Sequence, residues 1–128
     1  MVVTEDCAYD MMQRGRELLE EGHPAQAAMV LESAKLVEPR KGSLLEMLGR
    51  AYYRWGRFAA AAGSFEEALE VDPTNDYAHY CLGLCYLKTG RTVEAGGHFK
   101  LAWTLNPLDE YREMALRFLA GGRGGRGG

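Results

Sequence analysis

The sequence repeats itself every 34 residues, and this period limits the possible folds more than any other feature of the chain. Five residue positions keep one residue type through three copies: Gly15, Gly49 and Gly83; Gly22, Gly56 and Gly90; Ala27, Ala61 and Ala95; Ala34, Ala68 and Ala102; and Pro39, Pro73 and Pro107. A fixed period of this length indicates stacked copies of one structural unit, in which each copy buries its apolar side against its neighbours.

Each copy reads as two amphipathic helices. In the middle copy, residues 45–73, large apolar residues recur at helical spacing and are interrupted by small ones such as Gly49 and Ala61. Small residues that face large ones allow two helices to approach closely. The pattern therefore predicts an antiparallel helix pair with its turn at Gly56.

Glycine, proline and capping residues predict where the helices end. We expect helices over residues 5–21, capped by Thr4, and 24–37, followed by a pair that begins near Ser43 as N-cap and ends before Pro73. The third pair begins after the Thr74–Asn75–Asp76 cluster, turns at Gly90 and ends before Pro107. Gly96 and Gly97 predict a weak final helix in this pair, because glycine costs roughly 1 kcal/mol against alanine in a helix interior.

A seventh helix over residues 109–120 is expected to cap the array. Its apolar stripe consists of Tyr111, Met114, Ala115 and Phe118, and Leu116 and Leu119 make it wider than a one-sided cap needs. Residues 121–128, GGRGGRGG, have no side chain that could build a core and predict a disordered tail.

The period and its residue pattern resemble the tetratricopeptide repeat. The family's signature residues correspond in the second copy to Leu45, Leu48, Gly49, Tyr52, Ala61, Phe65, Ala68 and Pro73, and in the third to His79, Leu82, Gly83, Tyr86, Ala95, Phe99, Ala102 and Pro107. The first copy matches more weakly, with Arg14 at a position that is usually leucine. The resemblance implies a domain over residues 1–120 with repeats at about 8–41, 42–75 and 76–109 and the capping helix at 109–120.

The resemblance also implies a fold and a kind of function. The fold is an all-α, right-handed α-solenoid of three helix-turn-helix repeats, whose first helices line a concave groove that binds peptides or helices of partner proteins. Carried over by position, the partner-binding residues are Tyr9, Met12, Arg16, Met47, Arg50, Tyr53, Arg54, Tyr77, Tyr80, Leu84, Leu87 and Lys88. One subset of the family clamps the carboxyl end of chaperone tails, but none of Met12, Arg16, Met47, Tyr77 and Cys81 keeps the residue type of that clamp.

The expected groove combines arginine with aromatic and apolar residues. This mixture favours an acidic partner segment with hydrophobic anchors. The alternative interpretation is that Arg16, Arg50 and Arg54 only pair with Glu20 and Glu46 across the groove.

An apolar stripe on the third repeat, Tyr77, Tyr80, Leu84 and Leu87, needs something to cover it. The capping helix, a second copy of the chain and a partner protein are all open. We favour a protein-interaction adaptor or scaffold, and the alternative is a self-assembling homo-oligomer.

Other chemistry has little support in the sequence. Cys81 and Cys85 lack further metal ligands at suitable spacing, and His23, His79 and His98 lack a partner nucleophile, so we expect no enzyme, metal or cofactor. A net charge of −3 does not favour nucleic acid, and Arg123 and Arg126 could neutralise only two phosphates. Without an apolar run or export signal, and with three cysteines, the chain is expected to be cytoplasmic and not membrane-bound.

Overall fold

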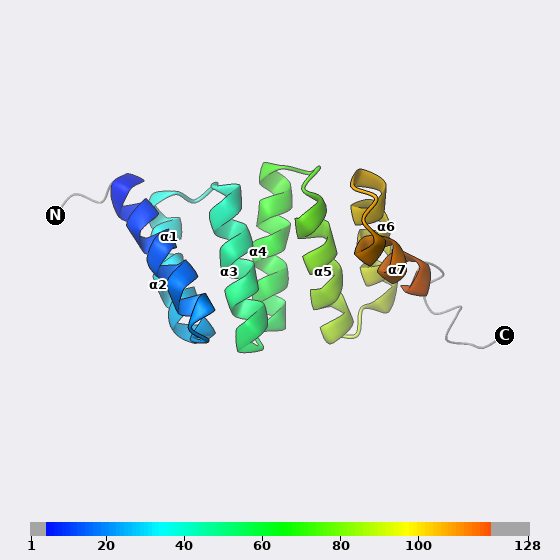
Figure 1. Cartoon of the computed structure of the whole chain (residues 1–128), viewed down its shortest axis with the longest axis horizontal. Helices are drawn as coiled ribbons and strands as arrows, with labels where there is room; N and C mark the ends of the chain where they lie inside the picture. The colour runs from blue at the N-terminus through cyan, green and yellow to red at the C-terminus, as the bar shows by residue number, and fades with distance from the viewer. Residues whose placement is uncertain (1–4, 119–128) are drawn as a thin grey trace.

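A computed structural model describes residues 5–118 as an array of seven α-helices (Figure 1). They are α1 (Glu5–Glu20), α2 (Pro24–Val37), α3 (Gly42–Trp55), α4 (Phe58–Val71), α5 (Asp76–Lys88), α6 (Thr92–Leu105) and α7 (Asp109–Phe118). The expected all-α solenoid of three helix pairs and a capping helix is confirmed. Thr4, the last two positions of the expected capping helix and the glycine-arginine tail lie outside the described residues.

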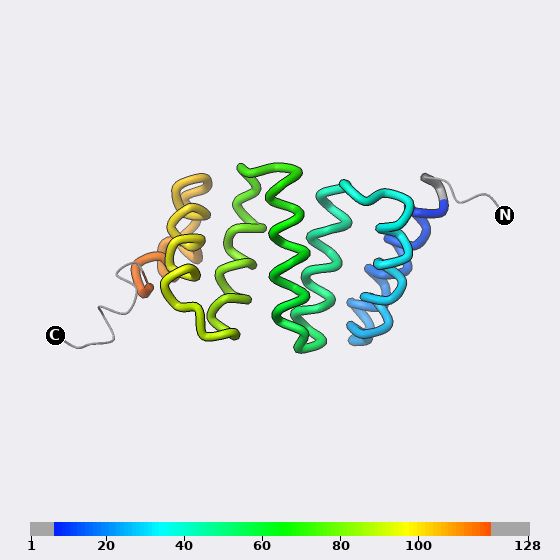
Figure 2. Tube along the Cα trace, turned by 180° about the vertical axis from the view of Figure 1, so that it is seen from behind, coloured from blue at the N-terminus to red at the C-terminus, as the bar shows by residue number. Residues whose placement is uncertain are grey.

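Consecutive helices pack against each other along the whole array, from α1 with α2 to α6 with α7. The first helices of the pairs, α1, α3 and α5, lie on one side with α7 (Figure 1), and α2, α4 and α6 lie on the other (Figure 2). We call these sides the groove face and the outer face. None of the helices between residues 5 and 118 is long and apolar enough to cross a membrane.

The same hydrogen-bonded turn closes all three helix pairs. Gly22, Gly56 and Gly90 have φ angles of 86°, 86° and 80°, which only glycine adopts without strain. At the middle turn the Gly56 N–H donates to the Tyr53 carbonyl at 3.0 Å and the Arg57 N–H donates to the Tyr52 carbonyl at 2.8 Å. This pair of bonds is a Schellman motif, and it confirms the turn expected at each glycine.

The helix starts agree with the sequence only in part. Asn75 is the N-cap of α5, and its side chain accepts a hydrogen bond from the Ala78 N–H at 3.0 Å, as expected. Ser43 is not the N-cap of α3, because that helix already begins at Gly42 with Lys41 at the cap position and no side-chain cap. The Ser43 hydroxyl was therefore misread as a start signal.

The small positions of the period are where the two helices of a pair approach most closely. A Cβ atom added at Gly15 would lie 2.6 Å from Leu31, one at Gly49 would lie 2.7 Å from Phe65, and one at Gly83 would lie 2.6 Å from Phe99. Leu31, Phe65 and Phe99 are all fully buried. The expected small-against-large packing is thus confirmed three times.

Helix α7 caps the array as expected. Tyr111 and Ala115 are buried, and Met114 and Phe118 pack against the core of the second and third repeats. Gly96 has a packing role that its helix propensity did not reveal, because a Cβ there would collide with the carbonyl oxygen of Phe118. Leu116 remains 49% exposed.

Candidate functional site

A small pocket opens on the groove face between α3 and α5. Its volume is about 150 Å³, and its lining residues are Arg50, Tyr53, Arg54, Phe65, Tyr77, Cys81 and Leu84. Five of these seven belong to the set that the sequence placed in the groove. They come together because Arg50, Tyr53 and Arg54 lie one turn apart on α3, while Tyr77, Cys81 and Leu84 lie about one turn apart on α5.

The two arginines at this pocket are exposed and form no ion pair with any residue in the described part of the chain. Among residues 5–118 the ion pairs join Arg14 with Glu17, Lys35 with Glu67 and Arg91 with Glu94. Glu46 instead accepts a hydrogen bond from the Asn75 side-chain amide at 2.5 Å. The alternative interpretation, in which the groove arginines are neutralised by Glu20 and Glu46, does not describe this part of the chain.

On the α5 side, the pocket is lined by Tyr77, Cys81 and Leu84, and the hydroxyl and thiol groups among them are kept neutral by burial. Burial raises the pKa of the Tyr77 phenol well above its usual value, and the neighbouring Cys81 raises it further. Burial also raises the pKa of Cys81 and of Cys85 to about 12. Both thiols are therefore protonated at neutral pH, and neither offers the thiolate that acts as a nucleophile.

Helix α7 covers part of the stripe on α5 that the sequence left without a partner. The Tyr80 ring lies 4.9 Å from the ring of Tyr111, and its hydroxyl donates to Glu110 at 3.2 Å. Burial, with Glu110 close by, raises the pKa of Tyr80 to about 12. Leu84 and Leu87 are half-buried against the core, so the stripe is less available than its sequence indicates.

The remaining groove residues fall into two groups. Met12 and Met47 are only 6% and 5% exposed and belong to the core of the first two repeats, so they offer almost no surface to a partner. Tyr9 and Arg16 on α1 and Lys88 on α5 are exposed, and the Lys88 ammonium lies 5.6 Å from the centre of the Phe58 ring. Of the expected groove residues, Arg50, Tyr53, Arg54, Tyr77 and Leu84 therefore line a pocket, and it lies between α3 and α5.

A histidine pair links α5 with α6 and was not expected. The Nδ1 atoms of His79 and His98 lie 3.1 Å apart, and His79 Nε2 lies 2.9 Å from the Pro73 carbonyl oxygen. Since a carbonyl only accepts, His79 carries its proton on Nε2 when neutral, and His98 then donates from Nδ1. No periodic signal in the sequence links His98 with His79, which are 19 residues apart.

Known proteins match the chain in family and in fold. A sequence model of the tetratricopeptide repeat matches residues 12–62 and 46–110, whereas no curated protein matches. The first TPR of Spaghetti (RPAP3), bound to the HSP90 peptide SRMEEVD, has a TM-score of 0.86 and 18% identity over 92% of this chain and 94% of that chain. The Arabidopsis OM64 TPR domain has a TM-score of 0.85 and 17% identity over 91% and 97%.

A third solved structure, the Yersinia enterocolitica type III secretion chaperone SycD in complex with a peptide of the translocator YopD, has a TM-score of 0.77. It is 18% identical over 90% of this chain and 88% of that chain. At such identities the likeness to these three structures establishes the fold alone.

Proposed function

The chain belongs to the tetratricopeptide repeat family, and we propose that it is a non-enzymatic adaptor that binds an acidic partner segment with apolar anchors. The observation that carries this proposal is the α3–α5 pocket, an apolar cavity with two guanidinium groups at its rim that form no ion pair within residues 5–118. Two of the similar structures, RPAP3 and SycD, hold peptides, which supports a protein segment as the ligand.

The pocket suits one apolar side chain. A dry protein cavity of roughly 150 Å³ accepts a benzene-sized group, so the volume here accommodates an aliphatic or phenyl side chain. Arg50 and Arg54 lie at i, i+4 on the exposed edge of α3 and can each bind a carboxylate on the same segment bidentately. The side chain supplies hydrophobic affinity, and the carboxylates set its register.

A clamp for a terminal carboxylate is a poorer match for this chain. Met12, Met47 and Cys81 stand at three of the corresponding positions, and all three are buried and lack a strong hydrogen-bond donor. The proposed recognition therefore depends on internal acidic side chains rather than on a free chain end.

Self-association is the second candidate function, and one observation favours it. Leu116 on α7 is 49% exposed at the end of the array, where a further repeat would otherwise stack. Sedimentation at high protein concentration decides between the adaptor function and self-association. A dimer that dissociates in the Leu116→Glu variant supports self-association. A monomer supports the interpretation that a partner protein covers the apolar surface.

The adaptor function is tested with the peptide acetyl-Leu-Asp-Glu-amide, measured by calorimetry across a salt series. Arg50→Ala/Arg54→Ala should weaken binding by roughly 1–3 kcal/mol for each desolvated charged hydrogen bond that is lost. It should leave thermal stability unchanged, because exposed charges contribute little to folding. The control Arg14→Ala/Arg40→Ala removes the same charge outside the pocket and should bind as the wild type does. Equal affinity in both double variants excludes the arginine-rimmed pocket from recognition.

A further inference from the structure

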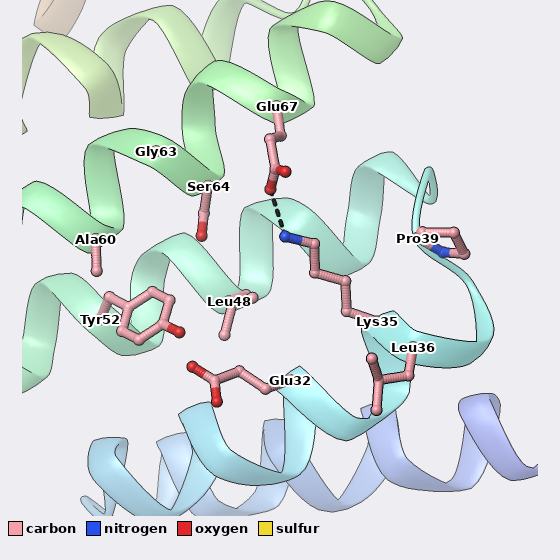
Figure 3. Close-up of a pocket in the computed structure, with 10 residues that line it drawn as sticks. All are labelled: Glu32, Lys35, Leu36, Pro39, Leu48, Tyr52, Ala60, Gly63, Ser64 and Glu67. Carbon is pink, nitrogen blue, oxygen red and sulfur yellow. Dashed lines mark hydrogen bonds and ion pairs between the residues drawn. The ribbon is translucent and has the colours of Figure 1, made fainter.

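A cleft runs between α2 and α4 on the outer face, opposite the groove (Figure 3). Its volume is about 680 Å³, within the range of ligand-binding pockets. Leu48 and Tyr52 of α3 form its floor, and Figure 3 shows the Glu32 carboxylate facing the same space as the Tyr52 ring. Within residues 5–118 the structure gives Glu32 neither a hydrogen bond nor an ion pair.

The equivalent positions one repeat later contain an arginine side chain on the tyrosine ring. One period after Glu32 and Tyr52 stand Glu66 and Tyr86, and the Tyr86 hydroxyl donates to Glu66 at 2.6 Å. There the chain supplies a cation of its own, because the Arg91 guanidinium lies over the Tyr86 ring at 4.2 Å from its centroid. Glu66, Tyr86 and Arg91 line a smaller pocket of about 260 Å³. In the third repeat the Tyr86 ring and the Glu94 carboxylate thus hold an arginine, and Glu66 accepts a hydrogen bond from the hydroxyl of that ring.

The first cleft has the equivalents of Glu66 and Tyr86, which are Glu32 and Tyr52, but it has neither an arginine on the ring nor an equivalent of Glu94. Arg57 is one period before Arg91, yet its guanidinium lies over Trp55 at 4.4 Å from the ring centroid. Two residue differences explain the diversion. Trp55 stands where the third repeat has Thr89, which offers no ring, and Ala60 stands where Glu94 pairs with Arg91 at 3.3 Å.

The rest of the cleft is open because its α4 wall is small. Ser64 lies one period before His98, whose larger, half-buried ring packs on His79 at 5.3 Å and on Tyr86 at 5.5 Å. At the other end of the first cleft, Lys35 and Glu67 form an ion pair at 2.6 Å and neutralise each other. Glu32 therefore gives the cleft a formal charge of −1, above an apolar floor and beside the exposed Leu36.

We propose that this outer cleft is a second docking site, which binds an arginine side chain of a partner protein together with an adjacent apolar residue. The guanidinium occupies the place on Tyr52 that Arg91 takes on Tyr86, stacks on the ring and bonds the Glu32 carboxylate. The neighbouring apolar side chain covers Leu48. The two faces then have opposite preferences, acidic segments for the groove and basic segments for the cleft, which allows one domain to bridge two partners.

The direct test titrates isotope-labelled protein with acetyl-Leu-Arg-amide and follows backbone amides by two-dimensional NMR. The matched probe acetyl-Leu-citrulline-amide has nearly the same shape without the charge. We expect the arginine probe to shift the amides of Glu32, Tyr52 and Ser64 with millimolar affinity, and the citrulline probe to bind at least about tenfold more weakly. Glu32→Gln should produce a similar loss, whereas Glu66→Gln should not change binding at this cleft.

Two further variants use the chain's own third repeat as the standard. Trp55→Thr/Ala60→Glu should bring Arg57 onto Tyr52 and abolish probe binding without unfolding, since both positions are exposed. Arg91→Ala should empty the equivalent place and add a second set of shifts around Glu66 and Tyr86.

The proposal is overturned if saturating probe leaves the cleft amides unshifted, if citrulline binds as well as arginine, or if the Trp55→Thr/Ala60→Glu variant binds like wild type. Shifts confined to the groove face overturn it too. A lysine probe that binds as tightly as the arginine probe would refute the stacking part. None of these outcomes bears on the groove, whose test uses an acidic peptide and Arg50 and Arg54.

Discussion

Replacing Gly83 by alanine tests the packing on which every repeat depends. The added Cβ would lie 2.6 Å from Cε1, 2.8 Å from Cδ1 and 2.9 Å from Cζ of Phe99. Carbon atoms in favourable contact are about 3.5–4.0 Å apart, so all three distances are too short. Phe99 is fully buried, with Tyr80 and Phe118 rings at 5.7 and 5.9 Å, and it cannot swing away into solvent. The helices α5 and α6 must therefore move apart.

The expected magnitude follows from two opposing effects. Overpacking a core by one or more methylene groups costs about 1–3 kcal/mol. Alanine in place of glycine in a helix interior recovers up to about 1 kcal/mol. Subtracting about 1 kcal/mol leaves a net loss for Gly83→Ala of about 0–2 kcal/mol, which lowers the melting temperature by up to about 8 °C in a domain of this size.

A second glycine on the partner helix separates these two effects. Gly97 lies inside α6, and a Cβ there has nothing within 4 Å. Gly97→Ala should therefore stabilise the domain by roughly 0.5–1 kcal/mol through helix propensity alone. Melting followed by far-ultraviolet circular dichroism compares the variants, and the difference between them isolates the collision. If Gly83→Ala melts with or above Gly97→Ala, the close crossing of α5 and α6 is wrong.

Three further predictions concern the third repeat and its cap. Burial, and then the nearby His79, lower the pKa of His98 below its usual 6.5, so the unfolded chain takes up the proton at a higher pH than the folded chain does. The free energy of unfolding should therefore be highest above about pH 6.5 and should fall as the pH drops. Urea denaturation across pH should show a less steep fall in His98→Gln. Glu66 raises the pKa of His98 and Arg91 lowers it. Equal pH dependence of stability in the wild type and in His98→Gln would refute this prediction. Tyr111→Phe removes the bond of 2.9 Å from its hydroxyl to Asp76 and should cost about 1 kcal/mol in chemical denaturation, whereas the exposed control Tyr9→Phe should cost nothing. Gly96→Ala should displace α7, and hydrogen exchange of the α7 amides should speed up while α1 and α2 stay protected; unchanged exchange in α7 would show that Gly96 does not govern the docking.

The sequence by itself determined the array, its three repeats and the turns between helices. The reason is that these features are local and repeated. Gly49 faces Phe65 and Gly83 faces Phe99, each 16 residues apart, and a glycine with positive φ closes each pair. Each of these glycine positions recurs three times at the same 34-residue spacing, so the pattern is not a chance coincidence. The position of Arg50 and Arg54 at one edge of α3 followed from helical spacing alone.

The tertiary structure decided which of the exposed-looking residues are available. Met12 and Met47 are at the groove positions of the pattern, but they are buried in the core that α1, α2 and α3 share, and α7 covers part of Tyr80. The histidine pair and the outer cleft depend on where side chains of different helices meet across 19 to 32 residues of chain. A period fixes which residues are equivalent, but not whether an arginine stacks on the tyrosine ahead of it or on the nearer tryptophan. That choice depends on competing contacts of similar energy, and only the packed arrangement resolves it.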